Sequence, residues 1–150
     1  MFAGMSFAAN KWDFGGAFST NSYTSQPILV VNIDNKYDVV VGYQTIPGAS
    51  GQDATSSILL GGTMWTFKTG AINCGWSLYY LSSVFADPGD DNKLTALSGA
   101  FTVKTQLVQD VTLRADAILL SSTSGKVNAN DYAGTAISPS LQLSLLFNFM

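Results

Sequence analysis

The last eleven residues of the chain, Ser140 to Met150, read SLQLSLLFNFM. Large apolar side chains occupy every second position, and the positions between them are mostly polar. The apolar set is Leu141, Leu143, Leu145, Phe147 and Phe149. Alternation with period two is typical of a β-strand that has one apolar and one polar face. The apolar face can point into a protein core or outward into lipid, and the rest of the sequence has to discriminate between the two.

The composition favours an all-β chain with few charges. Of the 150 residues, 47% are hydrophobic and 11% are charged, against about 25% charged in soluble domains. All ten acidic residues are aspartate, which suits turns, and glutamate, which suits helices, is absent. The length indicates a single domain over residues 1–150. The net charge of −3 speaks against a nucleic-acid partner.

Period-two patterning recurs eight times and predicts eight strands. The expected strands are residues 1–11, 26–33, 37–45, 56–68, 71–84, 94–107, 111–121 and 138–149. Short turns are expected at 34–36, 69–70 and 108–110, and they alternate with four long polar connections. This alternation predicts a closed antiparallel up-and-down barrel in which both termini lie at the short-turn end.

Pairing the residues across the expected turns places apolar residues opposite apolar ones and polar residues opposite polar ones. Turn 108–110 pairs Lys104 with Arg114, and turn 34–36 pairs Asn32 with Asp38, both on the polar face. Turn 69–70 puts Trp65 beside Cys74 on the apolar face. Five charged residues lie inside strands, and all five fall on the polar face: Asp38, Lys68, Lys104, Arg114 and Asp116.

This segregation of charge favours lipid on the outside. A soluble barrel needs a charged outer face, whereas the polar face here is mostly Ser, Thr, Asn, Gly and Ala. In a membrane barrel, a Lys or Arg on the lipid face near the midplane costs about 2–4 kcal/mol, and no expected strand carries one there. Only a closed sheet satisfies every backbone N–H and C=O in hydrocarbon. The sequence therefore predicts an eight-stranded transmembrane β-barrel.

Aromatic residues near the two ends of the expected strands predict a lipid-facing girdle, because such rings anchor barrels at membrane interfaces. The expected girdle consists of Tyr37, Trp65, Phe67, Trp76, Tyr80, Phe147 and Phe149. An eight-stranded barrel has a lumen that side chains fill, so we expect an interior ion-pair network of Asp38, Lys104, Arg114 and Asp116. That network is either a structural plug or part of a narrow ion path.

The chain resembles small eight-stranded outer-membrane β-barrels of the OmpA-transmembrane, OmpX or OmpW-like class. Its ending is similar to their C-terminal insertion signal, with Phe147 and Phe149 in the aromatic positions and Met150 one residue beyond. The resemblance implies a bacterial outer-membrane location with both termini periplasmic. It also implies that the last strand contacts the outer-membrane insertion machinery.

The residue types offer little for catalysis. Histidine is absent, which excludes the common nucleophilic triads. The single cysteine, Cys74, is too little for a zinc site, and we expect no enzyme activity, metal or cofactor. The expected function is a structural or interaction role, as a scaffold or a subunit of an envelope assembly whose loops contact protein partners. A narrow channel for ions or small polar solutes is the alternative, followed by a soluble lipid-binding barrel.

Overall fold

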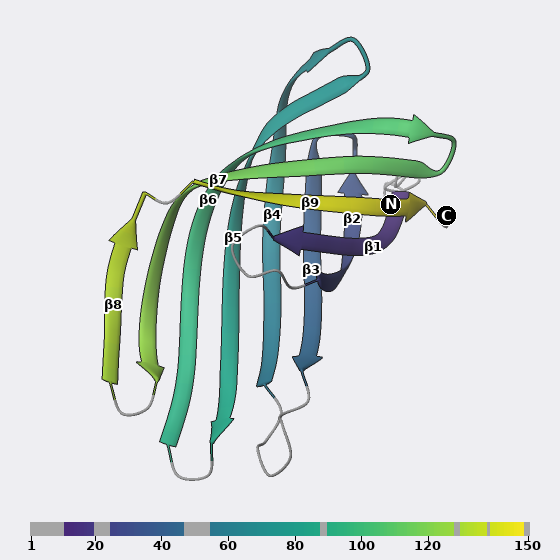
Figure 1. Cartoon of the computed structure of the whole chain (residues 1–150). Coiled ribbons are helices and arrows are strands. Elements are labelled where there is room, and N and C mark those ends of the chain that lie inside the picture. Colours follow the sequence, from purple (N-terminus) through teal and green to yellow (C-terminus); the bar gives the residue numbers. More distant parts are fainter. Residues whose placement is uncertain are drawn as a thin grey trace, which may run out of the picture.

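The computed structural model of the chain is all β and describes residues 11–19, 25–46, 55–87, 90–127, 130–137 and 139–148. These residues form nine strands in one sheet (Figure 1). The strands are β1 (Lys11–Ser19), β2 (Ser25–Ile33), β3 (Tyr37–Ile46), β4 (Thr55–Thr69), β5 (Ile72–Asp87), β6 (Asp90–Val108), β7 (Val111–Val127), β8 (Asn130–Ala136) and β9 (Ser140–Asn148).

Eight of these strands close into an antiparallel barrel, which confirms the predicted fold class. Each strand from β1 to β7 pairs with the next, and β9 closes the ring between β7 and β1. Strand β7 has two partners along one edge, because residues 111–118 pair with β9 and residues 121–127 pair with β8. Strand β8 therefore extends a hairpin beyond the ring, in a stretch where the sequence predicts only a long loop.

The first strand of the ring differs from the prediction. Residues 1–10 of the expected strand 1–11 lie outside the described residues, and the ring strand is Lys11–Ser19, where a polar loop was expected. Its alternation is hard to read because Gly15 and Gly16 interrupt it and Asp13 is charged. Even so, Phe14 is exposed on the outer face while Ala17 is buried on the inner one.

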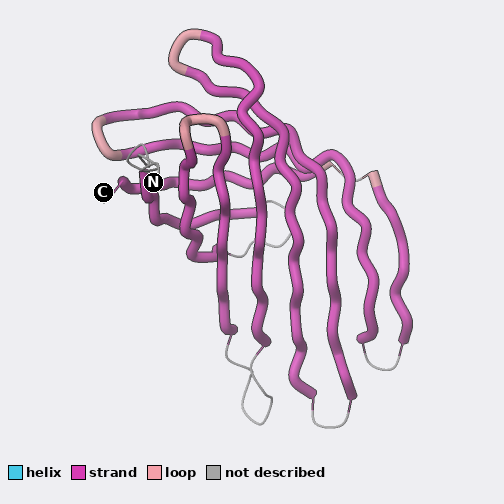
Figure 2. The backbone as a smooth tube through the Cα atoms, turned by 180° about the vertical axis from the view of Figure 1, so that it is seen from behind, coloured by secondary structure: helices cyan, strands magenta, loops and turns pink. Residues whose placement is uncertain are grey.

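Two of the three predicted turns keep their registers. The short turns are drawn as pink loops at one end of the sheet (Figure 2). Asp34 and Asn35 both have positive φ, 51° and 54°, and Lys36 N donates to Ile33 O at 3.0 Å, which is a type I′ turn. The predicted pairs Asn32–Asp38 and Lys104–Arg114 are both confirmed. At the second turn, Val108 pairs with Val111 across Gln109 and Asp110. The register shifts between Gln106 and Val108, and Leu107 has no cross-strand partner in this register.

The register of the β4–β5 hairpin corrects the prediction. Its turn is Gly70–Ala71, with Gly70 at φ 58°, and a β-bulge lies between Trp65 and Phe67. Cys74 consequently pairs with Phe67, whereas Trp65 pairs with Gly75 on the inner face. A bulge adds one residue to one strand and reverses the face of everything beyond it, and nothing in the local sequence marks it.

The alternating C-terminal stretch points its apolar side chains outward. In β9, Leu143 is 38% exposed and its neighbour Ser144 is 1% exposed, and the alternation continues to Phe147 on the outside. Leu146 departs from the pattern, since it is apolar but points inward and is buried. Within the described residues, the apolar face of SLQLSLLFNFM therefore points outward and not into the core. Phe149 lies outside the described residues.

The interior is layered rather than uniformly polar. Charged and amide side chains fill the end near the short turns, and an apolar layer lies beside them towards the long connections. This layer consists of Ala17, Ile28, Val30, Val40, Leu59, Tyr79, Ala100 and Leu146, with Leu81 and Ile118 packed against it. Runs such as PILVV, residues 27–31, indicate such a layer, because a strand with apolar side chains on both faces reads as continuously apolar.

Two adjacent glycines on β4 give a prediction about packing. A Cβ at Gly61 would overlap the ring of Tyr79, whereas a Cβ at Gly62 would meet nothing nearer than the Asp38 carbonyl at 3.9 Å. Gly61→Ala is expected to lower the free energy of unfolding by about 1–3 kcal/mol through overpacking. Gly62→Ala is the control and should stay within about 0.5 kcal/mol of the parent. Denaturant titration measures both, and equal effects would contradict the contact with Tyr79.

Candidate functional site

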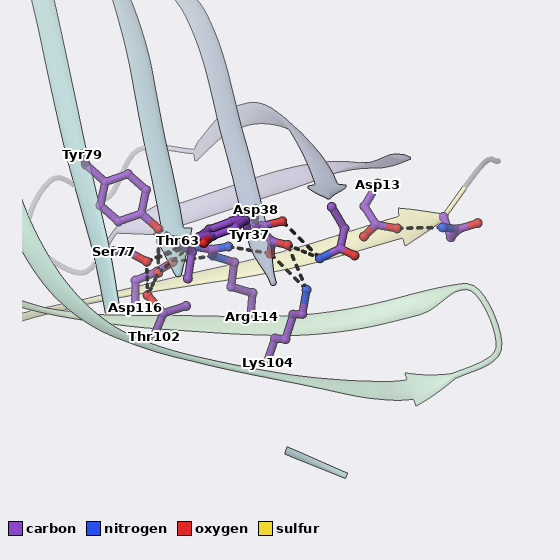
Figure 3. A network of polar contacts seen from close by, with 12 residues as sticks. Asp13, Tyr37, Asp38, Thr63, Ser77, Tyr79, Thr102, Lys104, Arg114 and Asp116 are labelled. Carbon is purple, nitrogen blue, oxygen red and sulfur yellow. Dashed lines mark hydrogen bonds and ion pairs between the residues drawn. The ribbon is translucent and has the colours of Figure 1, made fainter. Parts of the chain in front are cut away.

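The centre of the interior is Arg114, which β7 places inside the barrel at 1% exposure. Its Nε and Nη2 donate to the two carboxylate oxygens of Asp116, each at 3.1 Å, and its Nη1 donates to Asp38 Oδ2 at 3.2 Å (Figure 3). This contact with Asp116 is bidentate, the geometry that a planar guanidinium favours with a carboxylate. Arg114 therefore links two carboxylates from β3 and β7, strands that are far apart in the sequence.

Hydroxyl groups complete the shell around this ion pair. Asp116, which is 0% exposed, accepts hydrogen bonds at Oδ1 from Tyr79 OH and Thr102 Oγ1, both at 2.6 Å. Arg114 also donates to Thr63, Ser77 and Tyr79. A buried ion pair is stable only when its remaining donors and acceptors are satisfied, and these four hydroxyls do that.

Lys104 extends the network towards the short-turn end. Its Nζ lies 3.1 Å from both carboxylate oxygens of Asp38, and Asn32 Nδ2 donates to Asp38 Oδ1 at 2.6 Å. Lys104 and Arg114 face each other across β6 and β7, an arrangement that is repulsive by itself. Asp38 sits between them and contacts both, so the four ionic residues form one neutral cluster of two cations and two carboxylates.

Trp65 belongs to this interior and not to the outer surface, so its predicted place in the lipid-facing girdle is wrong. The Lys104 ammonium lies 4.3 Å from the centre of the Trp65 ring, and the Arg114 guanidinium lies 5.8 Å from it. Such cation–π contacts strengthen when the cation is partly desolvated. The physical reason for the inward position is the β-bulge between Trp65 and Phe67.

The other aromatic residues of the predicted girdle that the structure describes are on the outer surface. Tyr37, Phe67, Trp76, Tyr80 and Phe147 are each 40% to 54% exposed. Trp76 also packs edge-to-face against Phe101, with ring centres 5.3 Å apart. Phe149 lies outside the described residues.

Sequence reasoning placed the four ionic residues on the inner face but missed part of the site. The structure brings Asp38, Lys104, Arg114 and Asp116 together in direct contacts. The expected turn at 69–70 places Thr63 opposite Trp76 on the apolar face, whereas in the structure it pairs with Ser77 and faces Arg114. Placing Thr63 correctly requires both the turn at Gly70–Ala71 and the bulge between Trp65 and Phe67. Gly70 in the left-handed region is a sequence signal for the turn, but the bulge has none.

A polar vestibule opens above the cluster at the short-turn end. One cavity of about 190 Å³ has only polar or charged lining among the described residues. Its lining consists of Lys11, Asp13, Asn32, Asn35, Asn73, Lys104, Gln106, Asp110, Thr112 and Asn148. Asn148 Nδ2 donates to Asp13 Oδ1 at 3.1 Å, which ties the end of β9 to the start of β1. The vestibule thus leads from the short-turn end down to Lys104.

The described residues contain no group of three or more His, Cys, Asp or Glu side chains placed to hold a metal ion. They also contain no helix with the length and hydrophobicity that a membrane crossing by a helix requires.

Fold and interior together define the chain as a closed eight-stranded antiparallel barrel with a buried, charge-neutral ion cluster. No protein-family model matches the sequence, and no curated protein matches it. Among solved structures, the chain is similar to the crystal structure of Neisserial surface protein A. The two share 17% sequence identity over 93% of this chain and 96% of that one, with a TM-score of 0.43.

Proposed function

We propose that this protein is an integral β-barrel of a bacterial outer membrane with a structural or interaction role. The observation that carries the proposal is the outer face of the ring. Large apolar side chains stand 38% to 58% exposed on it, among them Phe14, Val39, Leu60, Leu78, Leu97 and Leu143. Monomeric soluble proteins rarely expose a contiguous apolar patch larger than a few hundred Å². An exposed apolar face of this kind therefore supports contact with lipid.

The outer face also changes character where a membrane would end. Strands β4 to β7 have 15 to 19 residues, more than the roughly 9–11 that a tilted strand needs to cross a bilayer. Towards the long connections, hydroxyl pairs join the outer face of β6, β7 and β8. Thr95 bonds to Ser124 at 3.0 Å, and Thr135 bonds to Ser122 at 3.2 Å. Hydroxyl groups suit the polar headgroup region, and this boundary supports the proposed membrane position.

The distribution of charge argues against a soluble lipid-binding barrel. Such a protein would keep its apolar face inside around a ligand and its ions outside. Here Arg114, Asp38 and Asp116 are buried in the lumen, and the apolar layer around Val30 and Val40 is filled by its own side chains. The arrangement is therefore the inverse of a soluble barrel.

The filled lumen favours a scaffold over a channel. The apolar layer lies directly beside the ion cluster, and its residues Ile28, Val30 and Val40 are at most 1% exposed. An ion crossing the lumen would have to leave water and pass this layer without a partner, which is costly. We infer that the barrel anchors the protein while its long connections contact protein partners. The last strand engages the insertion machinery, and both termini are periplasmic.

The same interior gives no support for catalysis. Asp38 and Asp116 are committed to Arg114, Lys104 and hydroxyl donors, so neither carboxylate is poised to act as a general base on a substrate. We propose a protein without enzyme activity, in which membrane lipid is the partner of the whole outer face.

The test of the membrane proposal is the medium that the folded chain requires. The refolded protein should stay in solution only with detergent or lipid, because its apolar outer face needs cover. It should also migrate differently on a gel before and after boiling. A folded chain that remains monomeric and soluble without detergent would contradict the proposal.

Electrical recording separates the scaffold from the channel. In a planar bilayer the inserted protein is expected to give no steady ion conductance, since the apolar layer closes the lumen. Lys104→Gln and Arg114→Gln are informative comparisons, because both residues line the polar side of that layer. Steady openings in the parent that shift in size in these variants would favour the channel instead.

A further inference from the structure

A second cavity lies beside the vestibule and differs from it in charge. It has a volume of about 540 Å³ and lies where the β4–β5 hairpin meets the barrel. No acidic residue is among the described residues that line it, whereas Asp13 and Asp110 line the neighbouring cavity. Its lining consists of Asn32, Asn35, Trp65, Thr66, Phe67, Lys68, Asn73 and Lys104.

The unbalanced positive charge of this cavity comes from Lys68. Lys104 is neutralised from below by Asp38, and the cluster of Lys104, Arg114, Asp38 and Asp116 carries no net charge. Lys68, which is exposed beside the cavity, makes no ion pair within the described part of the chain. Its charge is therefore not balanced by any carboxylate that lines the same space.

Neutral hydrogen-bond donors surround the two ammonium groups. Asn35 and Asn73 line the cavity, and neither side-chain amide has a hydrogen-bond partner among the described residues. The Lys104 side chain is 17% exposed, so its ammonium is reachable from the cavity. Ammonium and amide donors are the groups that bind oxygen anions most strongly.

An independent observation comes from Trp65. Its indole Nε1–H is buried and has no acceptor in the described structure. A buried donor without an acceptor costs about 1–3 kcal/mol, and the residue lines this cavity rather than the apolar layer. The second cavity thus combines an unsatisfied indole donor in its wall with the absence of any acidic residue among the described residues that line it, a composition that favours a ligand with oxygen acceptors.

We propose that this cavity binds an oxyanion, a phosphate or carboxylate group, between Lys68 and Lys104. The anion accepts hydrogen bonds from the two ammonium groups and from the amides of Asn35 and Asn73. The same phosphate chemistry is offered by a free small molecule and by a lipid headgroup, and the site lies at the end of the barrel where either is accessible. The binding site depends on the fold alone and not on the membrane proposal.

Trp65 fluorescence provides the readout. In a Trp12→Phe/Trp76→Phe background, Trp65 is the remaining tryptophan, and its ring lies 4.3 Å from the Lys104 ammonium. Sodium phosphate should change its emission saturably, while sodium chloride at matched ionic strength should not. Lys68→Gln is expected to weaken phosphate binding about tenfold, the effect of one charge-assisted hydrogen bond. Lys36→Gln is the control, because Lys36 is exposed but lines neither cavity.

A second arm identifies the source of the anion. The refolded protein is compared in phosphatidylglycerol and phosphatidylcholine vesicles without added phosphate. A Trp65 response that requires phosphatidylglycerol and is reduced by Lys68→Gln assigns the site to a lipid headgroup, and a response to free phosphate alone assigns it to a small molecule. Lys68→Arg keeps the charge and should bind in either case.

Two results would overturn the inference. One is the absence of any Trp65 response in both arms from protein that shows the folded band on a gel. The other is an equal loss of affinity in Lys68→Gln and Lys36→Gln, which would show only general charge attraction. Neither result bears on the need for detergent, so the membrane proposal stands or falls separately.

Discussion

Arg114→Met is expected to lower the free energy of unfolding by about 3–5 kcal/mol, the usual cost of removing one partner from a buried ion pair. The substitution keeps much of the side-chain volume but leaves Asp116 and Asp38 without their shared cation. Asp116 is fully buried, so its carboxylate cannot recover this loss from water. Denaturant unfolding of the refolded protein, followed by tryptophan fluorescence or gel migration, measures the change.

The matched control uses an exposed ion pair whose lysine lies on the same strand as Arg114, β7. Lys126 lies 3.6 Å from Asp131, and both side chains are more than 60% exposed. Lys126→Met should therefore cost no more than about 1 kcal/mol. In addition, Arg114→Met combined with Asp116→Asn should cost less than the sum of the single changes, because the pair acts as a unit. An Arg114→Met variant as stable as the Lys126→Met variant would show that the cluster is not structural.

Leu78→Arg should destabilise the protein in lipid vesicles by about 2–4 kcal/mol, the cost of an arginine on the lipid face near the bilayer midplane. Leu78 is 58% exposed on the outer face of β5, between the outward-facing Trp76 and Tyr80. In water, a charge at so exposed a position would be harmless. The size of the effect therefore reports directly on what surrounds the barrel.

Ser124→Arg provides the comparison for this experiment. Ser124 is also exposed on the outer face, but it lies further towards the long connections, where its hydroxyl is 3.0 Å from that of Thr95. An arginine there should cost about 0–1 kcal/mol, as near an interface. If Leu78→Arg were no worse than Ser124→Arg, hydrocarbon would not be in contact with Leu78.

The sequence contained enough information to predict the barrel and the face that holds its charges. Regular alternation, as in Leu141 to Phe147, specifies which side chains share a face, and a residue pair such as Asn32–Asp38 follows once the turn is located. These features depend on local periodicity, which is the part of the fold that sequence reveals best.

The errors arose where the period breaks. The bulge at Trp65 moved that ring from the predicted outer face to the interior, and the glycines at 15 and 16 concealed strand β1. The apolar layer was also missed, because Val30 and Val40 point inward from strands that are apolar on both faces. Local propensity does not determine such features, since they depend on which strands meet across the lumen.

The closure of the ring by β9 has a consequence for biogenesis. Among the ring strands, β9 is the last to be synthesised, yet it pairs with both β1 and β7. Until it arrives, those two strands present open edges whose amides and carbonyls have no neighbour, a state that hydrocarbon penalises heavily and that invites aggregation in water. In the outer-membrane setting proposed above, the ring can close only after β9 has been made, so the two open edges have to be kept apart from other chains until β9 pairs with them.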